Sequence, residues 1–158
     1  MLEKVCNHVH NFFIRAAYPG SYEISAGTIA LTGLKNGQRF QIVGSDLNDG
    51  VYTWHDGGVI QNDDDTAPAA LADESFAGTI LAMSPPKAFL ELVGRISAWV
   101  DQYGAQSVSP FQSESVVGVY SYTKADAGTD ASGRPVAKTW ETAFVSELNA
   151  YRTPGVPL

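Results

Sequence analysis

The segment from Ser84 to Gly104 carries the strongest helical pattern in the chain, and it constrains the fold most. Its apolar residues step by four, three, four and three positions and therefore share one helical face: Phe89, Val93, Ile96, Val100 and Tyr103. Ser84 is a favourable N-cap, and the two prolines that follow it are tolerated in a first helical turn. Gly104 supplies a stop signal at the other end. A helix of this length needs other apolar surfaces against which to bury its stripe.

Stripes of the same kind predict a helix near each end of the chain. The N-terminal stripe consists of Leu2, Val5, Val9, Phe12, Phe13 and Ala16. Tyr18-Pro19-Gly20 ends that helix, because proline cannot continue it. Near the other end, Thr139 is a candidate N-cap for a last helix. Its apolar face consists of Trp140, Phe144, Leu148 and Tyr151. We expect the long helix to pack against both stripes.

Between the first two predicted helices, short β-prone runs alternate with turn signals. The runs are residues 22–24, 28–31, 39–43, 51–54, 59–60 and 79–83. Lys35-Asn36-Gly37 and Asn48-Asp49-Gly50 are hairpin signals, because Asn and Gly tolerate the positive φ of tight turns. Five or six short strands at this spacing predict a small antiparallel sheet or barrel.

Together these patterns predict an α+β fold, with a three-helix bundle-like core, an inserted small antiparallel β unit and a long loop before the last helix. We expect a single domain over residues 1–158, with a helical core from 1–19 and 84–158 and a β subdomain from 21–83. The length of 158 residues and the hydrophobic content of 44% suit one packed core.

Charge and cysteine content narrow the function classes. Seventeen acidic and ten basic residues leave a net charge of −7, which disfavours sequence-independent binding to a phosphate backbone. A single cysteine, Cys6, excludes an intramolecular disulfide framework and a Cys-rich zinc module. No apolar run approaches the ~20 residues of a membrane span, and the N-terminus lacks the plan of a secretory signal. We therefore expect no membrane contact.

Candidate catalytic and metal-ligating groups do not form a recognised pattern. Cys6 and His10 share a helical face, but two ligands are insufficient for a structural zinc site. The run Asp63-Asp64-Asp65 lacks the alternating ligands, Gly and distal Glu of an EF-hand, so a solvated loop is the better interpretation. No nucleophile elbow, catalytic-cysteine context or phosphate-binding loop is present. The sequence therefore predicts no enzyme activity, no catalytic residue, no metal and no cofactor.

The segment from Ser109 to Lys124 is the best candidate for a binding site. It mixes Ser, Gly and aromatic residues with few charges, and its β-prone valines and tyrosines would be exposed in a free loop. Two interpretations remain open: the segment binds a partner, for example by strand addition to an exposed edge, or it folds back over its own helices. On the first interpretation, the binding residues are Ser113, Glu114, Ser115, Val116, Val117, Val119, Tyr120 and Tyr122.

Several motifs, in the same order along most of the chain, resemble small proteins of tailed bacteriophages and prophages. They are residues 37–45, 48–52, 73–76, 78–80, the Pro85-Pro86 helix start, 96–104, 109–115, 118–124 and the terminal Trp140 helix. The set is similar to head–tail connector (adaptor, neck) proteins, which are encoded in the capsid-to-tail gene block.

This resemblance implies a structural protein that forms an oligomeric ring below the portal protein and joins the capsid to the tail during virion assembly. The implied partners are the portal, neck/stopper or tail proteins, and further copies of the chain, while DNA passes through the ring without specific binding. The implied location is the head–tail junction of the virion, and the bacterial host cytoplasm during assembly. Connector folds are built on a helical bundle, from which the β insertion at 22–83 departs.

Two alternatives belong to other classes of function. One is a tail-completion or minor tail protein, in which the β unit performs the recognition. The other is a small carbohydrate-binding or hydrolase module that uses an aromatic surface at Tyr52 and Trp54 together with the Asp63–Asp65 loop.

Overall fold

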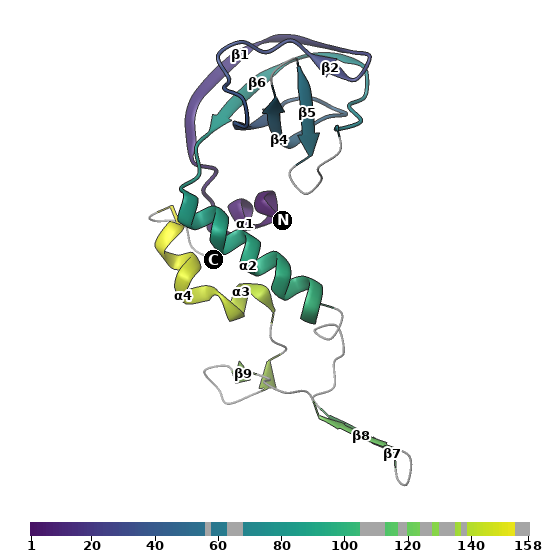
Figure 1. Cartoon of the computed structure of the whole chain (residues 1–158), viewed down its shortest axis with the longest axis vertical. Coiled ribbons are helices and arrows are strands. Elements are labelled where there is room, and N and C mark those ends of the chain that lie inside the picture. Colours follow the sequence, from purple (N-terminus) through teal and green to yellow (C-terminus); the bar gives the residue numbers. More distant parts are fainter. Residues whose placement is uncertain are drawn as a thin grey trace. The chain divides into compact units, whose positions relative to one another are not determined.

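The computed structural model describes residues 1–55, 58–62, 68–104, 113–116, 120–123, 128–129, 135–136 and 139–153. The chain divides into two compact units. One consists of Met1–Leu90 with Tyr151–Leu158, and the other of Glu91–Ala150. Figure 1 labels most of the elements of both units.

The first unit is built on a six-stranded antiparallel sheet that curves into a nearly closed barrel (Figure 1). In sheet order, its strands are β2 (Thr28–Ile29), β1 (Ile14–Ser25), β6 (Glu74–Met83), β3 (Arg39–Val43), β4 (Gly50–His55) and β5 (Val59–Asn62). Each strand is antiparallel to its neighbours. Strand β6 holds the centre of the sheet, because it pairs with β1 on one side and with β3 on the other.

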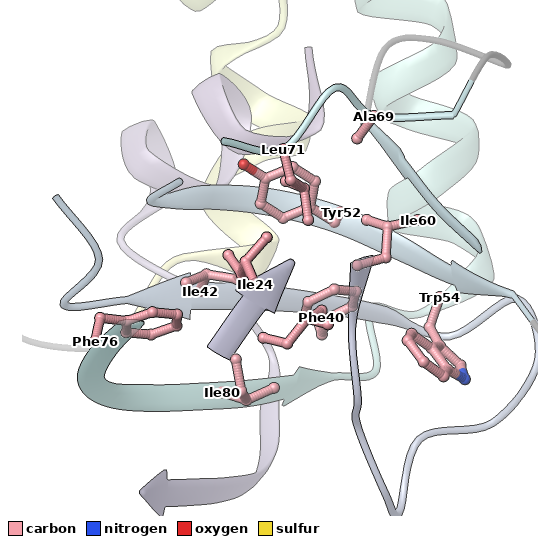
Figure 2. Packing of buried hydrophobic residues seen from close by; sticks show 11 residues of the cluster. Ile24, Phe40, Ile42, Tyr52, Trp54, Ile60, Ala69, Leu71, Phe76 and Ile80 are labelled. Carbon is pink, nitrogen blue, oxygen red and sulfur yellow. The ribbon is translucent and has the colours of Figure 1, made fainter. Parts of the chain in front are cut away.

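Alternating side chains fill the barrel, as Figure 2 shows. In β3, Phe40 and Ile42 are fully buried, whereas Val43 is exposed. Ile42 lies opposite Ile80 of β6, so both contribute to the same core. The core cluster consists of Ile24, Ile29, Phe40, Ile42, Tyr52, Trp54, Ile60, Ala69, Leu71, Phe76 and Ile80. Full burial of one large apolar side chain contributes about 1.5–3 kcal/mol, so burial of this cluster stabilises the unit.

Helix α1 (Leu2–Val9) precedes the barrel in the same unit. It buries Leu2, Val5, Cys6 and Val9, and it ends at His10, whose φ of 52° is left-handed. The C-terminal segment meets the end of this helix: the Asn11 side-chain amide donates to the Tyr151 carbonyl at 2.9 Å. The rings of Phe13 and Tyr151 both pack on Phe89, with centroids 4.6 and 5.0 Å away.

Helix α2 (Lys87–Tyr103) begins in the first unit and continues into the second. The second unit also contains α3 (Trp140–Ala143) and α4 (Val145–Leu148), and the 3₁₀ turn η1 (Asn149–Tyr151) follows α4. Its described buried apolar residues are Leu92, Val93, Ile96 and Leu148. Arg95 forms an exposed ion pair with Glu147, and its guanidinium lies 5.8 Å from the centroid of the Phe144 ring.

Two small antiparallel sheets belong to the same unit. One pairs β7 (Ser113–Val116) with β8 (Tyr120–Thr123), and the other pairs β9 (Gly128–Thr129) with β10 (Pro135–Val136).

The predicted three-helix bundle-like core is wrong. The described residues are mostly antiparallel β, and the N-terminal helix has only eight residues. Residues 14–18, predicted to end a helix, instead begin β1, because residues 14–24 pair with β6. Phe13 has a left-handed φ of 53°, which interrupts the predicted helical stripe. A long-range strand partner thus overrides a local helical pattern, because strand preference depends on pairing more than on intrinsic propensity.

Two further local predictions are corrected. The turn at Lys35-Asn36-Gly37 does not join two paired strands, because β2 pairs only with β1. The tight hairpin turn lies instead at Ala26-Gly27, with φ of 51° and 71°. The predicted last helix is interrupted at Phe144, whose φ and ψ of −113° and 13° separate α3 from α4.

Helix α2 and strand β3 match the predicted boundaries closely.

Candidate functional site

Six of the eight predicted binding residues lie in the β7–β8 ribbon, the two-stranded sheet formed by Ser113–Val116 and Tyr120–Thr123. Val117 and Val119 lie outside the described residues. Among the described strands, neither β7 nor β8 pairs with the six-stranded sheet. The structure therefore brings these six residues together in a separate element, and their role in binding stays a prediction.

The β7–β8 ribbon pairs its two strands over four residues each. Glu114 lies opposite Tyr122, and Val116 lies opposite Tyr120. An isolated two-stranded sheet is at best marginally stable in water. The ribbon therefore gains stability from any further strand or surface that covers it.

A second feature was missed by the sequence analysis: the open edge of β1, defined as residues 14–23. Strand β1 pairs with β6 from Ile14 to Ile24, but with β2 only at Ile24 and Ser25. On the side of β2, the open edge has no strand neighbour among the described strands. All of its residues are exposed except Ala16 and Tyr22, which are half-buried.

The direction of the backbone groups along this edge follows from the β1–β2 hairpin. The two-residue turn Ala26-Gly27 closes on the pair Ser25 and Thr28, so the backbone of Ser25 faces β2. Alternation by two then turns the backbone groups of Ala17, Pro19, Ser21 and Glu23 to the same side, away from β6. Pro19 fits this assignment, because proline within a sheet is confined to positions whose missing N–H would face away from a partner strand.

The opposite edge of the sheet is better protected. Strand β5 has only four residues, and Gln61 forms a bridge with Pro68 on its outer side. The backbone N–H of Ala69 donates to the Ile60 carbonyl at 2.6 Å. Proteins commonly blunt exposed edges by shortening or covering them, since free backbone groups recruit other strands. In the described part of the sheet, β1 is the long edge that keeps such groups available.

A hydrogen-bond network around Glu74 shapes the loop between β3 and β4. The Glu74 carboxylate accepts hydrogen bonds from the Ser45 hydroxyl, from the Asp46 backbone N–H at 2.8 Å and from the Asn48 side chain at 2.9 Å. Asn48 also accepts from the Ala72 backbone N–H at 2.8 Å. The Ser45 hydroxyl in particular lowers the pKa of Glu74, because it stabilises the charged form. Ser45 and Asn48 are buried, so the network has a structural role.

Strands β3 and β6 approach each other closely at Val43 and Gly78. A Cβ added to Gly78 would lie 2.4 Å from the Val43 carbonyl oxygen. Gly44 lies beside it, and its φ of 92° favours glycine. The motifs at 37–45 and 78–80 therefore meet in one place, where they shape the barrel.

A groove of about 460 Å³ lies between α1 and β4 in the first unit. Its lining residues are Met1, Glu3, Lys4, Asn7, Asp49, Gly50, Val51, Tyr52 and Asn62. Burial, followed by the charges of Glu3 and Asp49, raises the pKa of Tyr52. The Tyr52 hydroxyl donates to the Asn48 carbonyl at 3.0 Å, so this phenol is a neutral donor within the fold.

The aromatic surface expected for a carbohydrate-binding or hydrolase module is not formed. Tyr52 and Trp54 are both buried in the barrel core (Figure 2). The run Asp63–Asp65 lies outside the described residues.

Within the part of the chain that the structure describes, no three His, Cys, Asp or Glu side chains gather in a way that could hold a metal ion. Cys6 is buried in α1, and the His55 ring is hydrogen-bonded to the Gln61 side chain at 2.7 Å. None of the described helices is both long and apolar enough to cross a membrane.

Comparison with known proteins returned no match to a protein-family model, to a curated protein or to a solved structure. The function is therefore inferred from the geometry of the chain itself and from its sequence motifs.

Proposed function

We propose that this chain is a structural head–tail connector of a tailed phage or prophage, and that it acts through protein–protein contacts. In this role it forms a ring below the portal protein and joins the capsid to the tail. It is not an enzyme and uses no cofactor.

The observation that carries the proposal is the presence of two separate β surfaces in one chain. The open edge of β1 exposes backbone groups at Ala17 and Ser21, and the β7–β8 ribbon is a sheet of its own. Free strand edges bind protein backbone by strand addition, which needs no pocket and no reactive side chain. A chain with two different binding surfaces can join two neighbours, one through each surface, which is what a ring component requires.

The motif region supports the same proposal. Residues that carry the resemblance, among them Ser45, Asn48 and Glu74, hold a loop of the barrel in place through partly buried hydrogen bonds. Residues with this role maintain the shape of the barrel, as a structural protein requires. The net charge of −7 also suits a conduit, because an acidic wall does not hold the phosphate backbone that passes through it.

The test is assembly with the portal protein encoded in the same gene block. We expect co-expression of the two proteins to give a complex in which electron microscopy shows a ring of this chain on the lower face of the portal. Portal from an unrelated phage is the control. Association with tail proteins and none with the portal would instead identify a tail-completion or minor tail protein. Binding to neither would contradict the proposal.

A further inference from the structure

We propose that copies of this chain join head to tail by strand addition, with β8 of one copy pairing along the open edge of β1 of the next. This inference rests on the proposed function, because it supplies the contact between ring neighbours. It goes beyond that function by naming the acceptor edge, the donor strand and a second copy as the occupant.

The acceptor is defined by where β1 lacks a neighbour. Strand β2 pairs with β1 only at Ile24 and Ser25. In the exposed part of β1 that precedes Ile24, the backbone groups of Ala17, Pro19 and Ser21 face outward. Pro19 offers only its carbonyl, whereas Ala17 and Ser21 offer an N–H and a carbonyl each. The edge therefore presents N–H donors at Ala17 and Ser21, and between them Pro19 is the one position without a donor. The stretch from Ala17 to Ser21 is long enough to accommodate the four residues of β8.

The choice of β8 as the donor strand follows from its composition. Its residues, Tyr120, Ser121, Tyr122 and Thr123, carry no charge, and three of the four are β-prone. Strand β7 contains Glu114, and a charge on an edge strand disfavours further pairing. A third strand added to β8 also converts a marginal two-stranded ribbon into part of a larger sheet.

A second copy is the occupant that the chain itself supports. The same molecule carries an edge without a neighbour and a ribbon in need of one, and these surfaces differ from each other. A contact between two different surfaces repeats from copy to copy and closes into a ring when the rotation permits. Pairing of identical β1 edges would instead give a closed dimer and would stop there.

Cysteine cross-linking between two separately labelled pools of protein tests this inference. The first pool carries Ala17→Cys or Ser21→Cys, and the second carries Ser121→Cys or Thr123→Cys. Cys6 is fully buried, so the parent chain serves as the background control. Lys35→Cys, at an exposed residue outside β1, controls for random collision. Directly opposed strand residues lie within disulfide range, so at least one combination of the pools should cross-link under mild oxidation.

A matched pair of variants tests the role of the backbone. Ser21→Pro removes an N–H that faces the open side, whereas Ser21→Ala keeps it. Pro19 lies two residues earlier in β1, and its backbone faces the same side as that of Ser21. The strand therefore already contains a proline in this orientation. We expect Ser21→Pro to weaken self-association at least about fivefold, the equivalent of one lost hydrogen bond, and Ser21→Ala to leave it unchanged. Circular dichroism should show the same folded content in both variants.

Three outcomes would overturn the inference. Cross-links only between two β1 cysteines would show pairing of like edges. Efficient cross-linking of a double variant, Ser21→Cys with Ser121→Cys, within one chain at high dilution would show that the ribbon folds onto its own sheet. Yields equal to those of Lys35→Cys would show that no contact forms. A ring on the portal without these cross-links would support the proposed function and reject this contact. Cross-links without portal binding would support the contact and reject the proposed function.

Discussion

The carboxylate of Glu74, at the start of β6, accepts a hydrogen bond from the hydroxyl of Ser45, 29 positions earlier in the chain. The same carboxylate collects donors from Asp46, Leu47 and Asn48 and so organises the whole β3–β4 loop. Two motifs that are distant in sequence thus form one structural unit at the end of the barrel. This relationship leads to a prediction about pH.

The hydrogen bonds to Glu74 make the stability of the protein depend on pH in the acidic range. Because its pKa is lowered from the ordinary 4.5 in the folded state, its stabilisation is present above that value and is lost as the pH falls through the folded pKa. Arg95 lowers the pKa of Glu147, so protonation of Glu147 also contributes to the loss of stability as the pH falls. We expect Glu74→Gln to melt at a lower temperature near pH 7 and to show a shallower decline on acidification. Thermal unfolding across the pH range measures both effects.

Glu23→Gln, at an exposed position on β1, is the control for the loss of one charge. It should lower the melting temperature near pH 7 less than Glu74→Gln does. Parallel profiles for wild type and Glu74→Gln would contradict the role of this carboxylate.

Two glycines should respond in opposite directions to the same substitution. In Gly78→Ala, the new Cβ meets the Val43 carbonyl oxygen and the Phe76 ring, and we expect a loss of about 1–3 kcal/mol. Gly94 lies exposed within α2 with nothing near its Cβ position. Gly94→Ala should therefore stabilise by up to about 1 kcal/mol, the difference in helix propensity. Urea unfolding of both variants provides the comparison, and equal effects would reject the close β3–β6 approach.

Neighbouring aliphatic residues in β3 test the inward and outward faces of the barrel. Ile42 is fully buried opposite Ile80, whereas Val43 is 38% exposed. Ile42→Ala should cost about 2–5 kcal/mol because it leaves a cavity. Val43→Ala should stay within about 0.5 kcal/mol of wild type. Chemical denaturation distinguishes the two, and a larger cost at Val43 would mean that the register is shifted by one residue.

Deletion of residues 114–124 tests whether the β7–β8 ribbon serves assembly or folding. Because the ribbon is a separate sheet, the melting temperature should stay close to that of wild type. Assembly with the portal should be abolished, which gel filtration and electron microscopy of the mixture can measure. An unfolded deletion variant would place the ribbon in the core and remove the main support for its role in assembly.

The sequence and the structure agree best where local signals decide. Helix α2 has its periodic stripe, its Ser84-Pro85-Pro86 start and its Gly104 end within one continuous segment. Strand β3 likewise shows its alternation in five residues. In both elements the relevant physics acts between residues close in sequence, so a pattern is enough to predict them.

Strand β1 shows the opposite case. Its partner, β6, lies about fifty residues later, and only their pairing makes Ile14–Ser25 a strand. The loop network has the same character, because Ser45, Asn48 and Glu74 are polar residues whose common role appears only after the barrel has formed. Pro19 was the one available signal: interpreted as a helix stop, it was equally consistent with an edge strand.

The sequence by itself determined the long helix, most of the short strands, the acidic charge and a β-prone segment between Ser113 and Thr123. Only the tertiary structure decided that the core is a barrel, that β1 forms its long edge and that this edge is open. The physical reason is that side chains carry periodicity, whereas a sheet edge consists of backbone groups common to every residue. Whether those groups are satisfied depends on which strand lies beside them, and that is settled only when the chain has folded.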